Sequence, residues 1–184
     1  MPSPLDNLTG PGKALRSEPP DAKEFAGLKR SGMARLSDAA NVANSLEGRF
    51  DLADNAAHAL CLAALRWHGY RPANRYIVFQ VLPHTLGLGA AVWGVLAKCH
   101  EVRNLGEYEG DLNVDERLLD ALIVACKAVG VALEKLQPPQ WGCSLKLGRC
   151  LVHGTQALLQ PDCCMLIRIG NDIHEFPLLI SHEA

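Results

Sequence analysis

The stretch FDLADNAAHALCLAALRWH, from Phe50 to His68, decides the fold of this sequence. Its apolar residues recur at the spacing of one helix face, which predicts an amphipathic helix. Many of them are alanines, so a neighbouring backbone can come close. Gly69 follows, and Arg66 and His68 lie in the last turn, where cations meet the negative end of the helix dipole. The sequence therefore predicts a helix that ends at about His68.

The same helical spacing continues on both sides of this stretch. It predicts helices over residues 20–45, 90–107 and 113–136, the last one beginning with a capping box made by Asn113 and Glu116. The short apolar run RYIVFQVLPHTLG fits a helix or a strand, and we expect a helix because its surroundings are helical. Four or five amphipathic helices with short connections predict an all-α, up-and-down bundle.

Both ends of the chain lack this periodicity. Residues 1–19 are rich in Pro, Gly and Ser, which predicts a flexible N-terminal arm. Residues 137–184 hold four of the seven cysteines and only short apolar patches. This irregular tail has three interpretations: a small β-like appendage, an unstructured segment, or an abnormal C-terminus created by a shifted reading frame. The bundle is thus expected over residues 20–136.

Composition places the chain among ordinary globular proteins. It has 184 residues, of which 48% are hydrophobic and 21% charged, enough for one domain with a core. No apolar run reaches the roughly 20 residues of a membrane span, and the start has no apolar signal region, so we expect a cytoplasmic protein without a membrane partner. Seven scattered cysteines indicate reduced thiols. A net charge of -2 means that nucleic acid would bind only through a local patch or a dimer groove.

A stripe of polar residues crosses the segment CHEVRNLGEYEG, residues 99–110. On a helix, positions i, i+3, i+4, i+7 and i+8 share one face. In this segment they are His100, Arg103, Asn104, Glu107 and Tyr108. The alanine-rich helix contributes a second polar set, Asp51, Asp54, Asn55 and His58. Helical bundles build their sites between such facing sets.

With HEVRN followed by EY near the end of a late helix, residues 20–136 resemble the HEPN superfamily, small all-helical proteins of prokaryotic toxin-antitoxin, defence and RNA-processing systems. The most specific part of the resemblance is Arg103-Asn104. It implies a homodimer that cleaves RNA without a metal, using an arginine and a histidine in an R-x4 to x6-H motif at the dimer interface. Arginine suits phosphate binding and histidine suits proton transfer near neutral pH. We expect no cofactor and no metal.

The chain departs from that motif at the histidine. Spacers of four, five and six residues after Arg103 lead to Tyr108, Glu109 and Gly110. A tyrosine with a pKa of about 10 is a poor base at neutral pH, although it can hydrogen-bond a phosphate. Our own hypothesis, outside the family motif, is that His100 or His58 supplies the imidazole.

A structural interpretation of the stripe stands beside this one. Arg103 can pair with Glu107 or Asp54, and both histidines can be ordinary helix residues. The chain would then be a non-catalytic interaction module, antitoxin-like or regulatory, whose stripe docks another protein. The two interpretations differ at Arg103. A buried, paired Arg103 favours the interaction module, and an Arg103 in an open groove favours binding of RNA or a nucleotide phosphate.

Two further patterns occur in the sequence. The segment RWHGYRPANRY, residues 66–76, alternates arginines with aromatic residues, which suits single-stranded nucleic acid, but also suits a helix end with a loop folded over the core. A zinc site is not expected, because the candidate ligands lack paired Cys-x2-4-Cys spacing. Those candidates are Cys143, Cys150, His153, Cys163 and Cys164. P-loop, GxGxxG, HExxH and GxSxG motifs do not occur in the sequence.

Overall fold

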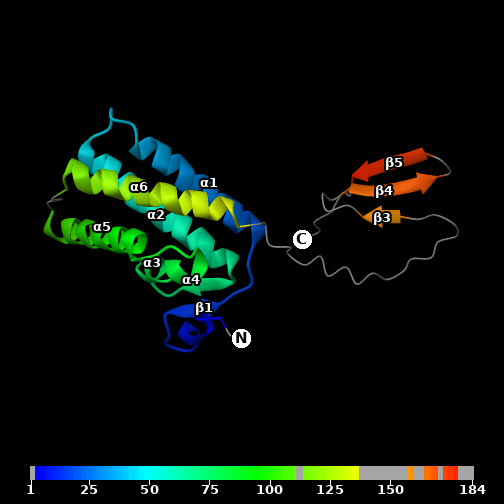
Figure 1. The fold of residues 1–184 in the computed structure, drawn as a ribbon, viewed down its shortest axis with the longest axis horizontal. Coiled ribbons are helices and arrows are strands. Elements are labelled where there is room, and N and C mark those ends of the chain that lie inside the picture. Colours follow the sequence, from blue (N-terminus) through cyan, green and yellow to red (C-terminus); the bar gives the residue numbers. More distant parts are fainter. Residues whose placement is uncertain (1–2, 111–113, 137–156, 160–163, 170–171, 178–184) are drawn as a thin grey trace. The chain divides into compact units, whose positions relative to one another are not determined.

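A computed structural model describes residues 3–110, 114–136, 157–159, 164–169 and 172–177, and most of these residues are helical (Figure 1). In the first part of the chain the elements are η1 (Asp6–Leu8), β1 (Leu15–Ser17), α1 (Ala22–Ala39), α2 (Leu46–Trp67), β2 (Tyr70–Pro72), α3 (Ile77–Gln80), α4 (Leu82–Thr85), α5 (Ala90–Glu109) and α6 (Glu116–Glu134). The second part holds β3 (Ala157–Leu159), β4 (Cys164–Ile169) and β5 (Asp172–Pro177).

The four long helices alternate in direction, as an up-and-down bundle requires. In Figure 1, α1 and α5 run one way and α2 and α6 run the other. Ion pairs agree with this view. Arg66 at the end of α2 pairs with Glu24 at the start of α1, and Arg49 at the start of α2 pairs with Glu116 at the start of α6. Helix α2 contacts the other three long helices and also β2, α3 and α4, so it is the central helix.

The small residues of α2 let α1 approach closely. Ala53, Ala56 and Ala57 are fully buried in the core. On α1 the matching position is Gly32, where a Cβ would lie 2.8 Å from Leu60 Cγ. Since real Cβ atoms do not approach that closely, the contact requires glycine at this position. The same Cβ would lie 3.4 Å from Ala56 O, so the backbone of α1 lies close to the alanine-rich helix at this point.

Side-chain caps set the helix boundaries and correct some predicted ones. Helix α1 ends at Ala39 rather than near residue 45, because Ser45 caps α2 by accepting a hydrogen bond from Gly48 N at 3.1 Å. The N-cap of α1 is Asp21, whose Oδ1 accepts from Glu24 N. Helix α6 is capped by Asp115, and the predicted cap Asn113 lies outside the described residues. The run RYIVFQVLPHTLG forms the short helices α3 and α4, as predicted.

The N-terminal segment is not the flexible arm that its composition suggested. Strand β1 pairs with β2 in antiparallel fashion, with Leu15 opposite Pro72 and Ser17 opposite Tyr70. Leu5 and Leu15 are buried in the main core. The apolar side chains offset the cost of ordering the Gly- and Pro-rich loop. Because β1 and β2 form this two-stranded sheet, the chain is mostly helical rather than all-α.

The C-terminal unit holds a small sheet. Strands β3, β4 and β5 form an antiparallel sheet in that order, with Ala157 opposite Ile167 and Ile169 opposite Asp172. These three strands are the described part of residues 137–184, and the other residues of the tail lie outside the described part. No helix in the described part of the chain is long and apolar enough to cross a membrane.

Candidate functional site

The polar residues of α2 and α5 meet around the carboxylate of Asp54, which is 0% exposed. Its Oδ2 lies 2.8 Å from Arg75 Nη2 and 3.5 Å from Arg103 Nε. Its Oδ1 lies 3.6 Å from His100 Nδ1. Three neighbours complete this group, which we call the Asp54 cluster: Asp51, Asn55 and Asn104. Part of each polar set predicted for the two helices therefore comes together: Asp51, Asp54 and Asn55 from α2, and His100, Arg103 and Asn104 from α5.

Burial and charge act on Asp54 in opposite directions. Burial raises the pKa of its carboxyl above the ordinary value, and Arg75, then His100 and Arg103, oppose that shift. An ionised carboxylate is costly to remove from water unless cations and hydrogen bonds replace the water. The two arginines therefore stabilise the ionised carboxylate of Asp54 at a buried position where it would otherwise be unfavourable.

His100 lies between Asp54 and the surface. Its ring is almost fully buried and packs against Phe79, with 5.5 Å between the ring centroids. Asn104 Nδ2 lies 3.2 Å from His100 Nε2, and an amide NH2 can only donate, so Nε2 accepts and the ring proton is on Nδ1, facing Asp54. Burial lowers the pKa of His100, although Asp54 opposes this. A neutral imidazole with its lone pair on the Asn104 side is the form that a proton acceptor needs.

Arg103 is paired within the subunit. Its Nε donates to Asp51 Oδ1 at 2.7 Å, and Asp54 is its second carboxylate partner. The side chain is only 18% exposed. Of the two arrangements considered for Arg103, this is the paired one, which favours the interaction module. The predicted pairing with Asp54 is confirmed, while the side chain of its other predicted partner, Glu107, lies outside the described part.

Hydrogen bonds do not saturate the Asp54 cluster. Asn55 bridges its two sides, since Nδ2 donates to Asp51 and Oδ1 accepts from Arg75 Nη2 at 3.0 Å. Within the described residues, however, three buried polar atoms have no hydrogen-bond partner, namely Asp54 Oδ1, Arg75 Nε and His100 Nδ1. Buried polar atoms are nearly always paired in folded proteins. Two of the three, Asp54 Oδ1 and His100 Nδ1, face each other across 3.6 Å, so a long contact rather than a short hydrogen bond joins the buried carboxylate to the imidazole.

Two predicted site residues lie apart from the cluster. His58 is half-buried one turn beyond Asp54 and makes no hydrogen bond among the described residues; burial, with Arg75 next, lowers its pKa to about 4. A base that weak cannot hold a proton at neutral pH. Tyr108 is 90% exposed on the last turns of α5. Of the two histidines proposed to supply the imidazole, only His100 contacts the cluster.

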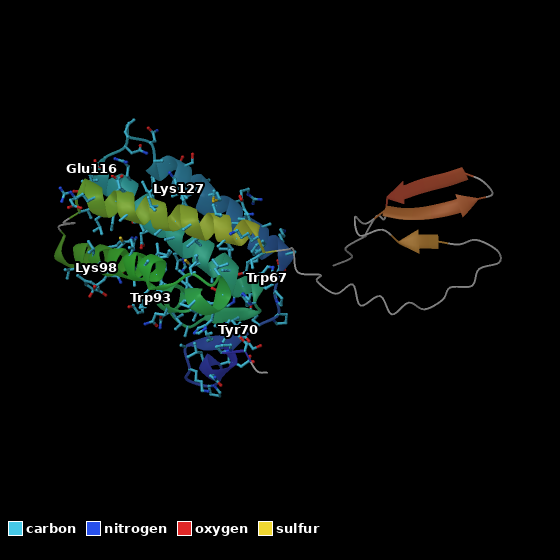
Figure 2. The ribbon with its side chains drawn as sticks, in the orientation of Figure 1. Trp67, Tyr70, Trp93, Lys98, Glu116 and Lys127 are labelled. Atoms are coloured by element: carbon cyan, nitrogen blue, oxygen red, sulfur yellow. The ribbon has the colours of Figure 1, made fainter. Side chains whose placement is uncertain are left out.

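A groove of about 460 Å³, which we call the α5 groove, opens beside His100. Its lining comes from α5 and from the residue before α3: Tyr76, Trp93, Gly94, Ala97, Lys98, His100, Glu101 and Asn104. In Figure 2, Trp93 and Lys98 lie along α5, and Lys127 lies on α6. His100 and Asn104 belong to both the Asp54 cluster and the α5 groove. Chemistry at His100 would therefore take place at the floor of an accessible groove.

Sequence reasoning missed Arg75 and the aromatic lining of the groove. Arg75 was assigned to a different candidate, and nothing in its local sequence shows that it reaches Asp54. Trp93 and Lys98 carried a weak signal, because Trp93 shares a helix face with Ala97, His100 and Asn104 at steps of three and four residues. Only the polar members of that face were considered.

In the second candidate segment, residues 66–76, each of the three arginines pairs with a carboxylate. Arg66 donates to Glu24, Arg71 to Glu18, and Arg75 to Asp54. Arginines that are already paired offer little charge to a phosphate. The structure corresponds to the alternative in which this segment is a helix end and a loop folded over the core.

No group of three or more histidine, cysteine, aspartate or glutamate side chains in the described part of the chain is placed to hold a metal ion. Of the zinc candidates weighed above, Cys143, Cys150, His153 and Cys163 lie outside the described residues, as does the side chain of Cys164.

Comparison with protein-family models, curated proteins and solved structures finds nothing that matches this chain. The chemistry of the Asp54 cluster and the α5 groove is therefore the basis for assigning a function.

Proposed function

We propose that this protein is a HEPN-like RNA- or nucleotide-binding protein, acting as a cytoplasmic homodimer, with its site at the Asp54 cluster and the α5 groove. One observation carries the proposal: His100 stands between a buried carboxylate and an open groove, with its Nε2 on the groove side. A carboxylate behind an imidazole fixes its tautomer and supports its positive form.

Metal-independent RNA cleavage is the activity that this arrangement supports. His100 Nε2 would accept the proton of the substrate 2'-hydroxyl, and the 2'-oxygen would attack the adjacent phosphorus. The bond to the 5'-oxygen would break, leaving a 2',3'-cyclic phosphate, and the proton would pass to the departing oxygen. Arg103, which pairs with Asp51 and Asp54, would hold in place the carboxylate behind His100, and Asn104 would yield its contact with Nε2 to the substrate. His100 would thus replace the histidine that the motif lacks at Tyr108.

A gel assay of structured and unstructured RNA in EDTA tests this proposal. Wild type should leave cyclic phosphate ends, and His100→Gln should reduce cleavage at least 100-fold, since a general base contributes about 10² to 10⁴ in rate. Arg103→Ala should also lose activity, whereas His58→Gln should keep it. Arg117→Ala, a change at an exposed arginine of α6, is the matched control. Full activity in His100→Gln would refute the role of His100.

A second function is supported by Arg103 itself. Its pairing with Asp51 and Asp54 inside one subunit is what a non-catalytic interaction module would show. Leu105 and Tyr108, exposed on the last turns of α5, would then contact a protein partner such as an antitoxin-like regulator. Wild-type protein that neither cleaves nor retains RNA would support this function over the first.

A further inference from the structure

The α5 groove has walls suited to a flat ligand. Tyr76 and Trp93 both line it, and neither ring is fully buried. Gly94 and Ala97 are the small residues of the lining, and a Cβ at Gly94 would meet no neighbouring atom within 4 Å. The groove is therefore open at the residue next to Trp93.

The rim and floor of the same groove offer hydrogen bonds of both senses. Lys98 Nζ donates to Glu101 Oε2 at 3.4 Å, and both side chains are exposed, so the pair separates at little cost. Lys98 can then donate to a ligand and Glu101 can accept from one. Asn104, at the floor beside His100, can do both. Aromatic surface next to a donor and an acceptor matches the face and the edge of a nucleobase.

We infer that the α5 groove binds an unpaired nucleobase, stacked on Trp93 or Tyr76, with Lys98 contacting the adjoining phosphate. The base can belong to a single-stranded RNA or to a free nucleotide, since both present the same chemistry. The volume of about 460 Å³ lies within the range of about 300–1,000 Å³ typical of small-molecule sites. This inference rests on the proposed function and names the part of the ligand that the groove holds.

The Asp54 cluster explains how the groove keeps its shape. Arg75, immediately before Tyr76, is held by Asp54 and Asn55 at 2.8 and 3.0 Å. Asn74, the next residue back, accepts a hydrogen bond from Ile77 N at 3.1 Å. His100, which also lines the groove, faces the same Asp54 carboxylate. One buried charge thus contacts His100 on α5 and the residue next to Tyr76, so the groove is organised before a ligand arrives.

Binding of the full-length protein to labelled RNA tests the inference. The probes are an unstructured octaribonucleotide, the same sequence as a duplex, and adenosine and guanosine monophosphates. The octamer should bind at least tenfold more tightly than the duplex, whose bases are stacked and paired. Binding of the monophosphates at near-octamer affinity would identify a free nucleotide as the ligand, whereas binding of the octamer alone would identify a strand.

Four variants locate the base. Trp93→Leu should weaken octamer binding by roughly 5- to 100-fold, the range expected for one stacked base, and Trp93→Phe should stay within about threefold because a ring remains. Lys98→Gln should weaken binding and reduce its salt dependence. Lys127→Gln, the same change at an exposed lysine of α6, is the matched control.

The outcomes separate this inference from the proposed function. Octamer binding that is equal in wild type, Trp93→Leu and Lys98→Gln would overturn the base site while leaving RNA binding intact. Wild type that binds no probe would overturn both. Since Lys98 is exposed and pairs only with Glu101 among the described residues, Lys98→Gln cannot fail merely by unfolding, and urea midpoints check the fold of Trp93→Leu.

Discussion

Helix α2 carries two fully buried charges of opposite sign, and their surroundings differ. Arg66, near its end, is 1% exposed, and Asp54, near its middle, is 0% exposed. Each nitrogen of the Arg66 guanidinium donates a hydrogen bond: Nε to Glu24 Oε2 at 2.9 Å, Nη1 to Glu18 O at 3.2 Å and Nη2 to Pro19 O at 2.8 Å. Around Asp54, three buried polar atoms lack a hydrogen bond within the described residues.

The difference separates a structural network from a site. The Arg66 network is saturated, and it ties the segment before α1 and the start of α1 to the end of α2. A saturated network stabilises one arrangement and has no capacity for another partner. In the Asp54 cluster the contact between Asp54 Oδ1 and His100 Nδ1 is long, 3.6 Å, and His100 also borders the α5 groove. An incompletely satisfied buried network costs stability, which a protein tolerates where a ligand or proton is handled.

The substitution Arg66→Met should have the largest effect of all, a loss of stability. The change leaves the carbonyls of Glu18 and Pro19 without their donor, and breaking a buried ion pair typically costs about 3–5 kcal/mol. Because Glu18 and Glu24 are only partly buried and keep Arg71 as a partner, we expect the low end, about 3 kcal/mol. Urea unfolding measures it, and Arg16→Met, at a side chain 73% exposed, should change stability by less than about 0.5 kcal/mol.

RNA binding by folded Arg66→Met should equal that of wild type, since Arg66 is not part of the Asp54 cluster. A loss of stability below about 1 kcal/mol, or a specific loss of RNA binding, would remove the distinction between the two networks.

The sequence predicted the parts of this comparison that depend on helical periodicity. The pattern that made α2 and α5 amphipathic also placed Asp54, His100 and Arg103 on facing sides, and the structure brings them together. The short helices α3 and α4 followed from their helical surroundings. Such features are local, because the residues that carry them are three or four positions apart.

Contacts between distant segments leave no periodic pattern in the sequence. Arg66, Arg71 and Arg75 look equivalent in the sequence, yet Arg66 completes a network with residues 42 and 48 positions away, while Arg75 reaches across 21 positions to Asp54. The pairing of β1 with β2 was hidden in the same way, because each strand has three residues and β1 follows a Gly- and Pro-rich loop. Partner choice here depends on the assembled bundle rather than on local propensity.

The next largest effect is a loss of stability in acid that originates near the Asp54 cluster. Burial, with Arg75, His100 and Arg35, lowers the pKa of His58 from 6.5 to about 4. Between those values the unfolded chain binds the proton more readily, so stability is complete above pH 6.5 and is lost as the pH falls toward 4. The full shift corresponds to about 3 kcal/mol, and because His58 is only half-buried, solvent screening reduces the expectation to about 2 kcal/mol.

Urea midpoints between pH 7 and pH 4.5 measure this loss, and His58→Gln should remove most of the His58 contribution. His100 adds a loss of the same sign, because burial also lowers its pKa. Asp54 acts oppositely, because its raised pKa makes protonation of the folded state favourable in acid. His84→Gln, at an exposed histidine, is the control. Identical pH profiles for wild type and His58→Gln would show that the ring is solvated in the folded protein.

A smaller change in stability is expected from Asp54→Asn, although Asp54 is as buried as Arg66. The amide removes the desolvation cost of the carboxylate and also its attraction for Arg75 and Arg103, and such opposing terms often nearly cancel. Both arginines keep another partner, Asn55 and Asp51 respectively. We expect a change within about 1.5 kcal/mol in urea unfolding, together with loss of RNA cleavage because His100 loses its carboxylate. A destabilisation equal to that of Arg66→Met would make Asp54 a structural charge.

The substitution Glu116→Gln should have the smallest effect on stability. Glu116 is the partner of Arg49, a third buried charge of α2. Arg49 Nε donates to Ala39 O at 3.0 Å, while its Nη1 lies 3.3 Å from Glu116 Oε2. The Glu116 side chain is 64% exposed, so the pair is screened by water, and we expect a loss of about 0.5 kcal/mol. Part of that loss comes from the first turn of α6, where a negative charge faces the positive end of the helix dipole.

Because salt screens an exposed pair, the loss should shrink in urea unfolding at 0.5 M sodium chloride, whereas the loss caused by Arg66→Met should remain. Equal salt sensitivity in the two variants would mean that water reaches Arg66 as readily as Glu116, and the contrast between a saturated interior network and a surface pair would disappear.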